Sequence, residues 1–579
     1  MKKVLSLVCG AMLAGMPLFA QESQVKNNWQ NGSLEQDGVY GAEIDRALDF
    51  LKGKKAKHRP VVALIGAGID LEHEALKDNL WTNPKEKADG KDNDKNGLVD
   101  DIHGWNFIGG KDGSVMERSM MEGDREWLRL KDKYADLIFD GKDFYKYENG
   151  NRVKLTPPSN KAEYDYFMNL LREQNSRLGS TYSGYIFANE FCRYGKIFFD
   201  RVRQMFPGKE KYSYEDFKVA NPVKSIDIKK DSLAAIAYTM INMHIGLYDG
   251  MLKQQGKQLD DLSFFFDYYE NKKNLLKAQE SWKTAWNNFG DDGRREIVGD
   301  DPYDINDRVY GNNVHLLSNS TGGTLAAGVI AGKRGVEGRN NPICENAEIM
   351  TLNVINTAGE PCLKDMALAI RYAVEHGADV ILCGLRQTVY PAAQRAWVEE
   401  SLKLAEEKGV LVIFTVTEYS VDLGEYTFYP NRDMTTPGLT NFMVVAPSDE
   451  KGNPFLKSDF GNEEVDLFAP GCNVFSTYMG DAYRAGSGAF VSGAVVAGVA
   501  ALIKAYYPSL TGSQIRALLN ENVTSREGVE VEKMFLSGRD LKQDVYLFDE
   551  LCLSGGIVNA YKAVVAADAL AKQGGGARR

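Results

Sequence analysis

Residues 62–70 read V-A-L-I-G-A-G-I-D, and this stretch has the pattern of a buried strand followed by a loop. It follows a basic run that begins at Lys57, and it joins an apolar run to a Gly-x-Gly turn. Such a run is typical of a parallel strand that is buried on both faces and delivers a loop at its carboxyl end. We therefore expect a parallel sheet whose functional residues gather at the carboxyl ends of its strands.

Further strand patterns follow downstream, and they alternate with amphipathic helical patterns. Strands that alternate with helices of about 10 to 15 residues imply βαβ units, whose connections place helices on both faces of the sheet. The sequence thus predicts an α/β fold with a mostly parallel sheet. The predicted strands cover residues 347–353, 378–383, 410–416, 442–446 and 465–469, and the predicted helices cover 363–376 and 397–408.

The composition is that of a globular protein, with 44% hydrophobic and 26% charged residues in a chain of 579. This length allows one large domain with a substantial insertion or a second domain. The formal net charge of -11 argues against a nucleic-acid partner, because sequence-independent binding to phosphate requires a basic surface. After the amino-terminal region, no uninterrupted apolar run is long enough to span a bilayer, so we expect no transmembrane segment.

The amino terminus has the pattern of a secretory signal. Lys2 and Lys3 precede an apolar run over residues 4–19, and Ala20 ends the pattern. We expect export to the periplasm, the cell surface or the medium. Lipidation of Cys9 is the competing interpretation, although the residue before it is not small. The other six cysteines permit disulfides but show no C-x-x-C spacing for a metal or redox site.

Between residues 112 and 300 the composition changes. Tyr, Phe, Lys, Asp and Glu dominate, and apolar residues fall at helical spacing, as at Tyr164, Phe167 and Leu171. We predict a helical insertion whose helices pack on one another, with an interaction surface as the alternative. The predicted organisation is a signal peptide at 1–20, a first part of the main domain at 21–111, the helical insertion at 112–300, the remainder of the main domain at 301–565, and a flexible tail at 566–579.

Three stretches resemble, in order and spacing, the catalytic motifs of subtilisin-like (S8 family) serine peptidases. Besides residues 62–70, they are 322–331, G-G-T-L-A-A-G-V-I-A, and 488–502, G-A-F-V-S-G-A-V-V-A-G-V-A-A-L. The family motifs are V-A-V-I-D-T-G-I-D, H-G-T-H-V-A-G-I-I-A and G-T-S-M-A-A-P-x-V-A-G-V-A-A-L. With D-I-H-G-W-N-F at 101–107, the chain resembles exported subtilases of the Bacteroidetes type. The resemblance implies a subtilisin-like three-layer fold with a mostly parallel sheet and a long helical insertion.

The same resemblance implies a degenerate catalytic triad. The positions of the orienting carboxylate, the general base and the nucleophile hold Gly66, Gly322 and Phe490, and none of these can perform its role. The oxyanion position holds Glu418, whose carboxylate would repel a developing oxyanion. The segment that resembles the substrate-cradling S-L-G-G of the family consists of Gly384, Leu385, Arg386 and Gln387.

We interpret the chain as an inactive homologue of a serine endopeptidase. It is expected to bind a peptide or protein partner through the former cleft or the insertion. One alternative is a working serine peptidase with a displaced triad, and another is a structural, envelope-associated protein without a cleft ligand. The candidates for a displaced triad are Asp70, His73, His315, Ser487 and Ser492.

A calcium site is predicted in the acidic stretch D-N-D-K-N-G-L-V-D at residues 92–100. Oxygen ligands fall at alternate positions and a glycine at the turn, as at the start of a calcium loop. Position twelve of an EF-hand would be His103 instead of Glu, which argues against a complete EF-hand. The alternative is a turn held by its own Asx side chains. The predicted ligands are Asp92, Asp94, Asn96 and Asp100.

Overall fold

The computed structural model separates the chain into two compact units. One lies within residues 123–290, and the other comprises residues of 17–122 and 291–579. We call the first the insertion unit and the second the sheet unit. The described residues are 28–576 except 67, 118–119, 121, 149–150, 172–175, 222–231, 271, 288–292, 336–340, 356–361, 385, 387–391, 433–437 and 538–539.

The sheet unit is built on a nine-stranded sheet with the order β13-β16-β10-β9-β8-β7-β1-β6-β2. Every neighbouring pair is parallel except β13 with β16 at one edge. The predicted α/β fold class is confirmed. The strands of this sheet are β1 (Val61–Gly66), β2 (Gly104–Asn106), β6 (Glu348–Asn353), β7 (Val380–Cys383), β8 (Leu411–Thr415), β9 (Phe442–Ser448), β10 (Leu467–Pro470), β13 (Thr524–Ser525) and β16 (Gly556–Ile557).

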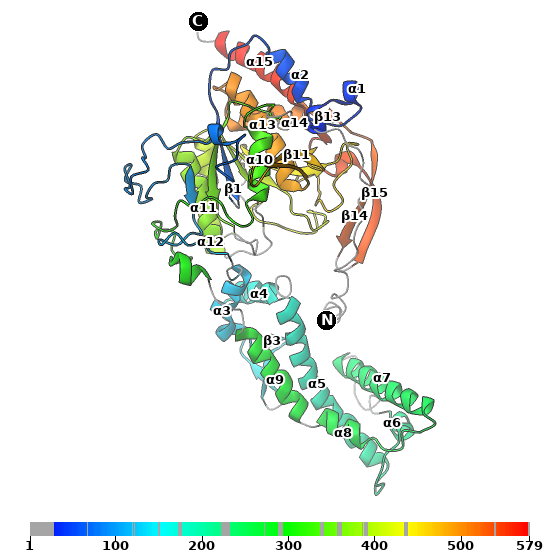
Figure 1. The fold of residues 1–579 in the computed structure, drawn as a ribbon. Helices are drawn as coiled ribbons and strands as arrows, with labels where there is room; N and C mark the ends of the chain where they lie inside the picture. Colours follow the sequence, from blue (N-terminus) through cyan, green and yellow to red (C-terminus); the bar gives the residue numbers. More distant parts are fainter. Residues whose placement is uncertain are drawn as a thin grey trace. The chain divides into compact units, whose positions relative to one another are not determined.

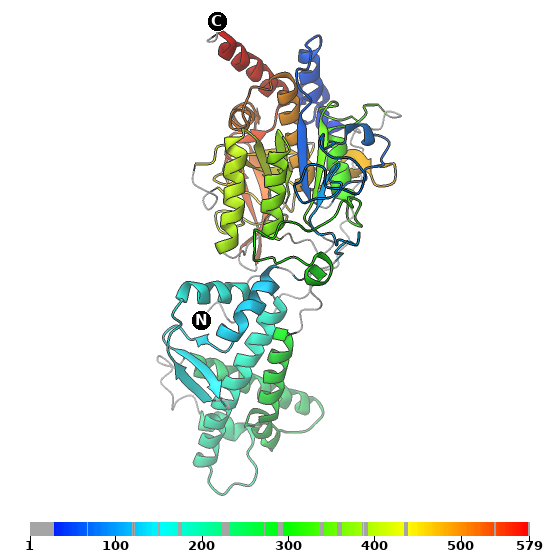
Figure 2. The ribbon, with the colours of Figure 1, turned by 90° about the vertical axis from the view of Figure 1, so that its left-hand side faces the viewer.

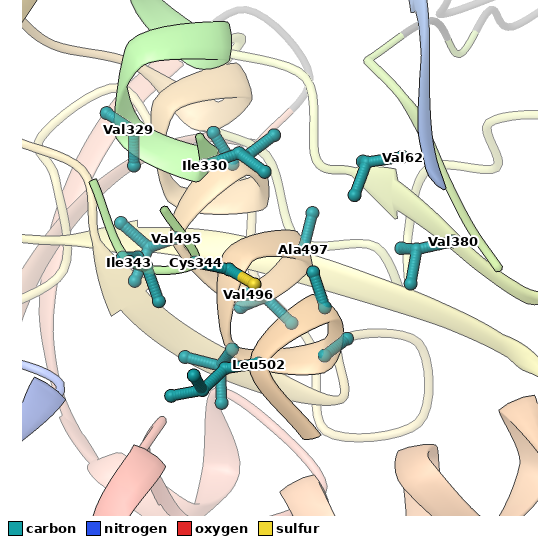
Figure 3. Packing of buried hydrophobic residues seen from close by; sticks show 14 of the residues in the cluster. Val62, Val329, Ile330, Ile343, Cys344, Val380, Val495, Val496, Ala497 and Leu502 are labelled. Carbon is teal, nitrogen blue, oxygen red and sulfur yellow. The ribbon is translucent and has the colours of Figure 1, made fainter. Parts of the chain in front are cut away.

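Helices cover both faces of this sheet, as the βαβ pattern predicts. On one face, α11 and α12 lie side by side in Figure 2 and bury alternate strand residues such as Ile381 and Phe414. On the other face, α10 and α13 pack over Val62 and Val380, as Figure 3 shows. The helices of the unit are α1 (Leu34–Asp37), α2 (Ile44–Leu51), α10 (Thr321–Ile330), α11 (Leu363–Glu375), α12 (Ala392–Glu407), α13 (Ala489–Tyr506), α14 (Gly512–Glu521) and α15 (Ala560–Gly576).

Helix α13 is the central element of the second layer. It has the length and apolar composition of a membrane-spanning helix, but 89% of it is buried inside the protein. Small residues allow this burial: a Cβ built on Gly493 would lie 2.7 Å from side-chain carbons of Leu382 and Thr415. The two hairpins of the unit pair β11 (Val474–Tyr478) with β12 (Ala482–Gly486) and β14 (Glu530–Ser537) with β15 (Asp540–Leu547).

The end of the chain differs from the expected flexible tail at 566–579. Residues 560–576 form α15, which packs against α2 (Figure 1). Ala567 is fully buried, and Asp568 pairs with Lys54 at 2.8 Å and accepts a hydrogen bond from Tyr507 at 2.9 Å. The Ala-rich helical pattern and this ion pair order a segment that its glycine-rich end made us expect to be frayed. The predicted signal peptide at 1–20 lies outside the described residues.

The insertion unit is mainly helical, and it also holds a three-stranded antiparallel sheet that the sequence did not indicate. Side chains from α5, α6, α7 and α8 form a buried cluster in it, aromatic on α5, α6 and α8, as at Phe199, Phe217 and Phe265, and aliphatic on α7. No disulfide joins the six described cysteines of the chain. The elements of the unit are α3 (Glu122–Tyr134), β3 (Ile138–Phe139), β4 (Phe144–Glu148), β5 (Asn151–Leu155), α4 (Lys161–Asn169), α5 (Ser176–Met205), α6 (Tyr214–Ala220), α7 (Ser232–Gln254), α8 (Ser263–Glu270) and α9 (Lys272–Asn287).

Candidate functional site

Three of the predicted site residues lie at the carboxyl edge of the sheet. Gly66 is the last residue of β1, Gly384 directly follows β7, and Glu418 lies three residues beyond β8. Because β1, β7 and β8 are adjacent parallel strands, these residues share one edge. Phe490 reaches the same edge from the first turn of α13. The structure thus brings four of the predicted positions together in space.

The ring of the half-buried Phe490 occupies the space between β1 and β7. A Cβ built on Gly66 would lie 3.6 Å from Cζ of Phe490, which is ordinary van der Waals contact. A Cβ built on Gly384 would lie 2.5 Å from Cδ2 of the same ring, which is too close. Gly384 therefore makes room for the ring, whereas Gly66 has space for a side chain of its own.

Glu418 closes the amino terminus of α13. Its Oε1 accepts a hydrogen bond of 2.8 Å from the backbone N–H of Ala489, the first residue of the helix. The preceding residue, Gly488, has φ of 137° and has no side chain to cap the helix, and a Cβ there would lie 2.6 Å from Oε1. A carboxylate at a helix amino terminus is stabilised by unpaired N–H groups and the helix dipole. The carboxylate of Glu418 therefore already accepts the hydrogen bond of this N–H group at the edge of the site.

Gly322 is the second residue of α10, and its neighbour shows how differently two adjacent glycines can be placed. A Cβ on Gly322 would meet nothing within 4 Å. A Cβ on Gly323 would lie 2.0 Å from the backbone oxygen of Gly68, and one on Gly328 would lie 2.1 Å from Oγ1 of Thr477. Packing therefore requires a glycine at 323 and 328 but leaves open space beside 322.

Comparison with known proteins identifies the family of this sheet and its motifs. The model of the subtilase family matches residues 57–538. The chain belongs to the subtilase family. The thermostable alkaline protease of Halalkalibacterium halodurans (strain C-125) is 31% identical over 209 residues, 36% of this chain and 53% of that protein. Subtilisin Savinase of Lederbergia lenta is 31% identical over 206 residues, 35% of this chain and 70% of that protein.

Solved structures of subtilases and related proteases also match. The prenylagaramide maturation protease PagA has a TM-score of 0.34 and 20% identity, covering 43% of this chain and 82% of that chain. The epidermin leader peptide processing serine protease of Staphylococcus aureus has a TM-score of 0.36 and 18% identity, covering 45% and 67%. This chain spans about half the length of the alkaline proteases that it matches. The resemblance stated from the three motifs is confirmed at the level of the family.

Arg386, in the segment expected to cradle substrate, is directed into the protein. It is 5% exposed, its Nε donates to the backbone oxygen of Pro430 at 2.9 Å, and its Nη2 pairs with Glu464. Burial lowers the pKa of this guanidinium, although the carboxylate of Glu464 acts in the opposite direction. Leu385 and Gln387, the other predicted members of the segment besides Gly384, lie outside the described residues.

The residues considered for a displaced triad each have another partner or surrounding. Ser492 donates to a backbone carbonyl at 2.8 Å, and Ser487 accepts from a backbone N–H at 2.8 Å. His73 is 1% exposed and bonds through both ring nitrogens to backbone groups, while Asp70 accepts from backbone N–H groups. Burial lowers the pKa of His315 to about 3. Neither serine has a hydrogen bond to a histidine among the described residues.

The acidic loop at residues 92–100 is folded by its own side chains. Asp92 accepts hydrogen bonds of 2.6–3.1 Å from the three backbone N–H groups of residues 95–97. Asp100, predicted as a metal ligand, turns away and accepts from the N–H groups of residues 89–90. The loop therefore contains the Asx-type turn that we considered as the alternative to a calcium site.

Beside this turn, two groups of possible metal ligands meet within the part of the chain that the structure describes. In each group, one ligand atom per residue lies within 4.8 Å of the others: Glu86, Asp92 and Asp94 form one, and Asp94, Asp101 and His376 form the other. Glu86 is 7% exposed, and its Oε2 has no hydrogen-bond partner among the described residues. Burial raises the pKa of Asp101, next to Asp94. These carboxylates form an oxygen-rich group of the kind that binds Ca²⁺.

Asn96 stabilises this acidic group without offering its oxygen. Its amide nitrogen donates to Asp101 at 2.8 Å, and its Oδ1 accepts from the N–H of Leu98 at 2.7 Å. Sequence reasoning missed Glu86 and Asp101, because it followed the alternation of one loop. The adjacent Asp100-Asp101 pair offered a signal: on consecutive residues, one carboxylate can turn to the backbone while the other faces the loop.

Proposed function

We propose that this chain is an exported subtilase-fold protein that has lost peptidase chemistry and acts by binding a peptide or protein partner. The observation that carries the proposal is the position of Phe490, whose ring fills the space between Gly66 and Gly384. The signal pattern of residues 1–20 supports export to the periplasm, the cell surface or the medium.

Serine peptidase chemistry needs a nucleophile, a base that takes its proton, a carboxylate that orients the base, and donors for the oxyanion. The aromatic ring of Phe490 has no proton to give and no lone pair with which to attack a carbonyl. Gly66 and Gly322 have no side chains, and Glu418 places a negative charge against the N–H of Ala489. Loss of triad residues costs on the order of a millionfold in turnover, and residual rate depends on the oxyanion hole.

The decisive experiment is labelling of the purified protein, with calcium present, by a broad-spectrum fluorophosphonate probe. Intact mass is measured beside an active subtilase as control. We expect no adduct on this chain and complete labelling of the control. Labelling of one serine in the folded protein, but not in protein denatured beforehand, would establish a working displaced triad. This result would overturn the proposal that peptidase chemistry has been lost.

Restoring the reactive groups tests whether only these four positions are missing. Gly66→Asp, Gly322→His, Phe490→Ser and Glu418→Asn are combined, and hydrolysis of casein is measured. We expect measurable activity, because a Cβ at 66 or 322 meets no close neighbour. The matched control keeps Phe490 and restores the other three residues, and it should remain inert.

Partner binding is tested independently of hydrolysis. Fluorescein-labelled casein peptides are titrated with the protein and followed by anisotropy, with denatured protein as control. Saturable binding supports a peptide-binding role. Absence of binding to these peptides would favour the alternative of a structural, envelope-associated protein without a peptide ligand.

We further propose that the acidic group around Asp94 holds a structural Ca²⁺ ion. The candidate ligands are Glu86, Asp92 and Asp94 in one group and Asp94, Asp101 and His376 in the other, and the unpartnered Oε2 of Glu86 favours the first group. A bound cation would neutralise neighbouring carboxylates and hold the loop against the sheet. At 100 times Kd it would stabilise the protein by about 2.7 kcal/mol. We expect 5 mM calcium to raise the melting temperature, and Glu86→Gln to remove most of that increase, whereas Glu72→Gln should leave it unchanged.

A further inference from the structure

Helix α7 of the insertion unit carries two apolar rows, and only one of them is buried. α7 packs on α5 and α6 (Figure 1). The buried row contributes to the buried cluster of the unit through Ala234, Ala237, Ile241 and Ile245. Met243 lies two residues beyond Ile241, which is about 200° around an α-helix of about 3.6 residues per turn. The side of α7 around Met243 therefore points away from this cluster.

The second row has the spacing of a helix that pairs with another helix. It runs through Ile236, Met240, Met243 and Leu247, at intervals of four, three and four residues. Apolar residues at alternating intervals of three and four form the contact seam of paired helices. Among the described residues, none of these four belongs to the buried cluster of the unit. A helix that packs only on its own protein needs one apolar row, so the second row indicates a further helix as partner.

Large apolar side chains at this row are exposed to solvent, and α8 widens the exposed area. Met243 is 55% exposed, Leu247 is 63% exposed and Met251, one turn further, is 60% exposed. Phe264 of α8 is 55% exposed and stacks on the ring of Tyr248 of α7, with the ring centroids 5.9 Å apart. These five side chains form one surface, which we call the α7 face.

The size of the α7 face matches the apolar part of a stable interface. Side chains of this size have about 150–250 Å² of surface and are about half exposed here, so that each leaves about 100 Å² in contact with water. The five together expose on the order of 500 Å². A standard interface buries about 800 Å² per partner, of which about 65% is apolar in homodimers. The α7 face can therefore supply the apolar share of one dimer interface.

The charge pattern of α7 indicates the kind of partner. Between residues 232 and 252 the only charged residue is Asp249, which is buried and pairs with Lys253 at 2.7 Å. Lys253 is the only basic residue of α7, whereas helices that lie on anionic membranes are rich in lysine and arginine. A partner with charged residues at the contact would bury them without a counter-ion. The α7 face therefore fits an uncharged, apolar helix face.

We propose that the α7 face binds the same face of a second copy of this chain, so that two insertion units form a two-fold symmetric dimer. A second copy supplies a helix with the same row, the same area and no charge at the contact. A two-fold interface needs only this one surface, because the same patch serves both partners. The inference goes beyond the proposed function, since it concerns the insertion unit and holds whether or not the sheet unit binds a peptide.

The first test is sedimentation velocity of the purified full chain between about 1 and 100 μM, because mass action makes a dimer depend on concentration. We expect the mass to rise from that of one chain toward that of two. The rise should persist at about 0.5 M salt, since salt screens charges and the α7 face has none.

A matched pair of variants locates the contact. Leu247→Glu should weaken the dimer at least about a hundredfold, since each copy would bring a carboxylate into the apolar contact. The control is Leu276→Glu, on α9 of the same unit, where the leucine is 60% exposed and lies outside the α7 face. It should dimerise like the wild type. Circular dichroism verifies that both variants fold.

A cysteine at the centre of the face identifies the second copy directly. Met243 lies near the middle of the row between residues 236 and 251, and a two-fold axis through the face brings this position close to its copy. Under mild oxidation with diamide, Met243→Cys should form a disulfide-linked dimer on a non-reducing gel, which requires Cα atoms within about 7 Å. Leu276→Cys and the wild type, treated in the same way, should remain single chains on that gel.

The mass of a single chain at every concentration would overturn the inference, and so would equal weakening by Leu247→Glu and Leu276→Glu. A chain that stays monomeric and binds phosphatidylcholine vesicles through Leu247 would assign the α7 face to a lipid surface instead. These results leave the proposed loss of peptidase chemistry intact, because that proposal depends on probe labelling and hydrolysis. Conversely, a labelled serine would end the proposed function and leave the dimer unaffected.

Discussion

Two adjacent glycines in the first turn of helix α10 differ completely in their surroundings. Gly322 faces open space, whereas a Cβ on Gly323 would lie 2.0 Å from the backbone of Gly68. Gly66 and Gly384 form a similar pair on neighbouring strands, one with room for a side chain and one pressed against Phe490. The subtilase frame therefore requires glycine at some positions, while at others a side chain is absent although nothing prevents it.

The largest loss of stability is expected from a substitution at a glycine that packing requires. Gly323→Ala places a methyl group inside the contact distance of the Gly68 carbonyl, and neither backbone can move without shifting β1 or α10. We expect a loss of about 3 kcal/mol in the free energy of unfolding, measured by urea denaturation.

The matched control for Gly323→Ala is Gly322→Ala, one residue away on the same helix. It should be neutral or stabilise the protein by up to about 1 kcal/mol, since alanine is the better helix former. Equal losses in the two variants would show that the contrast between the two glycines does not exist.

The second prediction concerns His315, whose backbone oxygen would lie 2.1 Å from a Cβ built on Gly68. Burial lowers its pKa from 6.5 to about 3, so the folded protein keeps the ring neutral while the unfolded chain binds a proton below pH 6.5. Stability contributed by this group is complete above pH 6.5 and is lost as the pH falls toward 3. Between pH 7 and 4.5, the wild type should lose about 2 to 3 kcal/mol more than His315→Gln.

Urea denaturation of both proteins at the two pH values measures that difference. His58→Gln is a suitable control, because His58 is partly exposed and pairs with Asp379 at 2.7 Å. If His315→Gln follows the same pH dependence as the wild type, His315 is not buried in its neutral form.

The third prediction addresses the ring that occupies the space beside Gly66. Phe490→Ala removes a half-buried aromatic side chain and should cost about 1 to 2 kcal/mol. In that variant, Gly384→Ala should become nearly neutral, because the ring that excludes a Cβ at 384 is gone. Additive losses in the double variant would contradict the direct coupling of these two positions.

The smallest effect is expected at the amino terminus of α13. Glu418→Ala removes the acceptor for the N–H of Ala489 and should cost about 1 kcal/mol, the usual value of a helix cap. Glu418→Gln keeps an oxygen in place and should cost less. A loss in Glu418→Ala no larger than in Glu418→Gln would show that water replaces the carboxylate without penalty.

The sheet could be predicted from sequence because its strands are buried on both faces. Short continuous apolar runs such as residues 410–416 and 442–446 are typical of strands that are buried on both faces. Both form strands of the predicted sheet. The motifs and the segment that resembles S-L-G-G also named Gly66, Gly384 and Phe490 as site positions, and the structure brings them together at one edge of the sheet. Local pattern and global topology agree at these positions.

The acidic loop was harder, because its geometry depends on contacts between distant segments. Glu86 and His376 reach Asp94 from other parts of the chain, and the direction of Asp100 is set by backbone N–H groups outside the motif. Arg386 is a similar case, since its burial follows from a partner at Glu464. Such side-chain partners have no fixed spacing in the sequence, so a local pattern cannot indicate them.

The pairing of α2 with α15 has a consequence for the order in which the chain can assume its structure. β1, an early strand, lies inside the sheet between β6 and β7, and α2 packs against α15. During synthesis, therefore, the first helices and strands emerge before the segments against which they pack. Contacts this distant in sequence slow folding and leave apolar surface exposed in the interval. A chain released before residue 560 would have the strands of the sheet but no cover for α2.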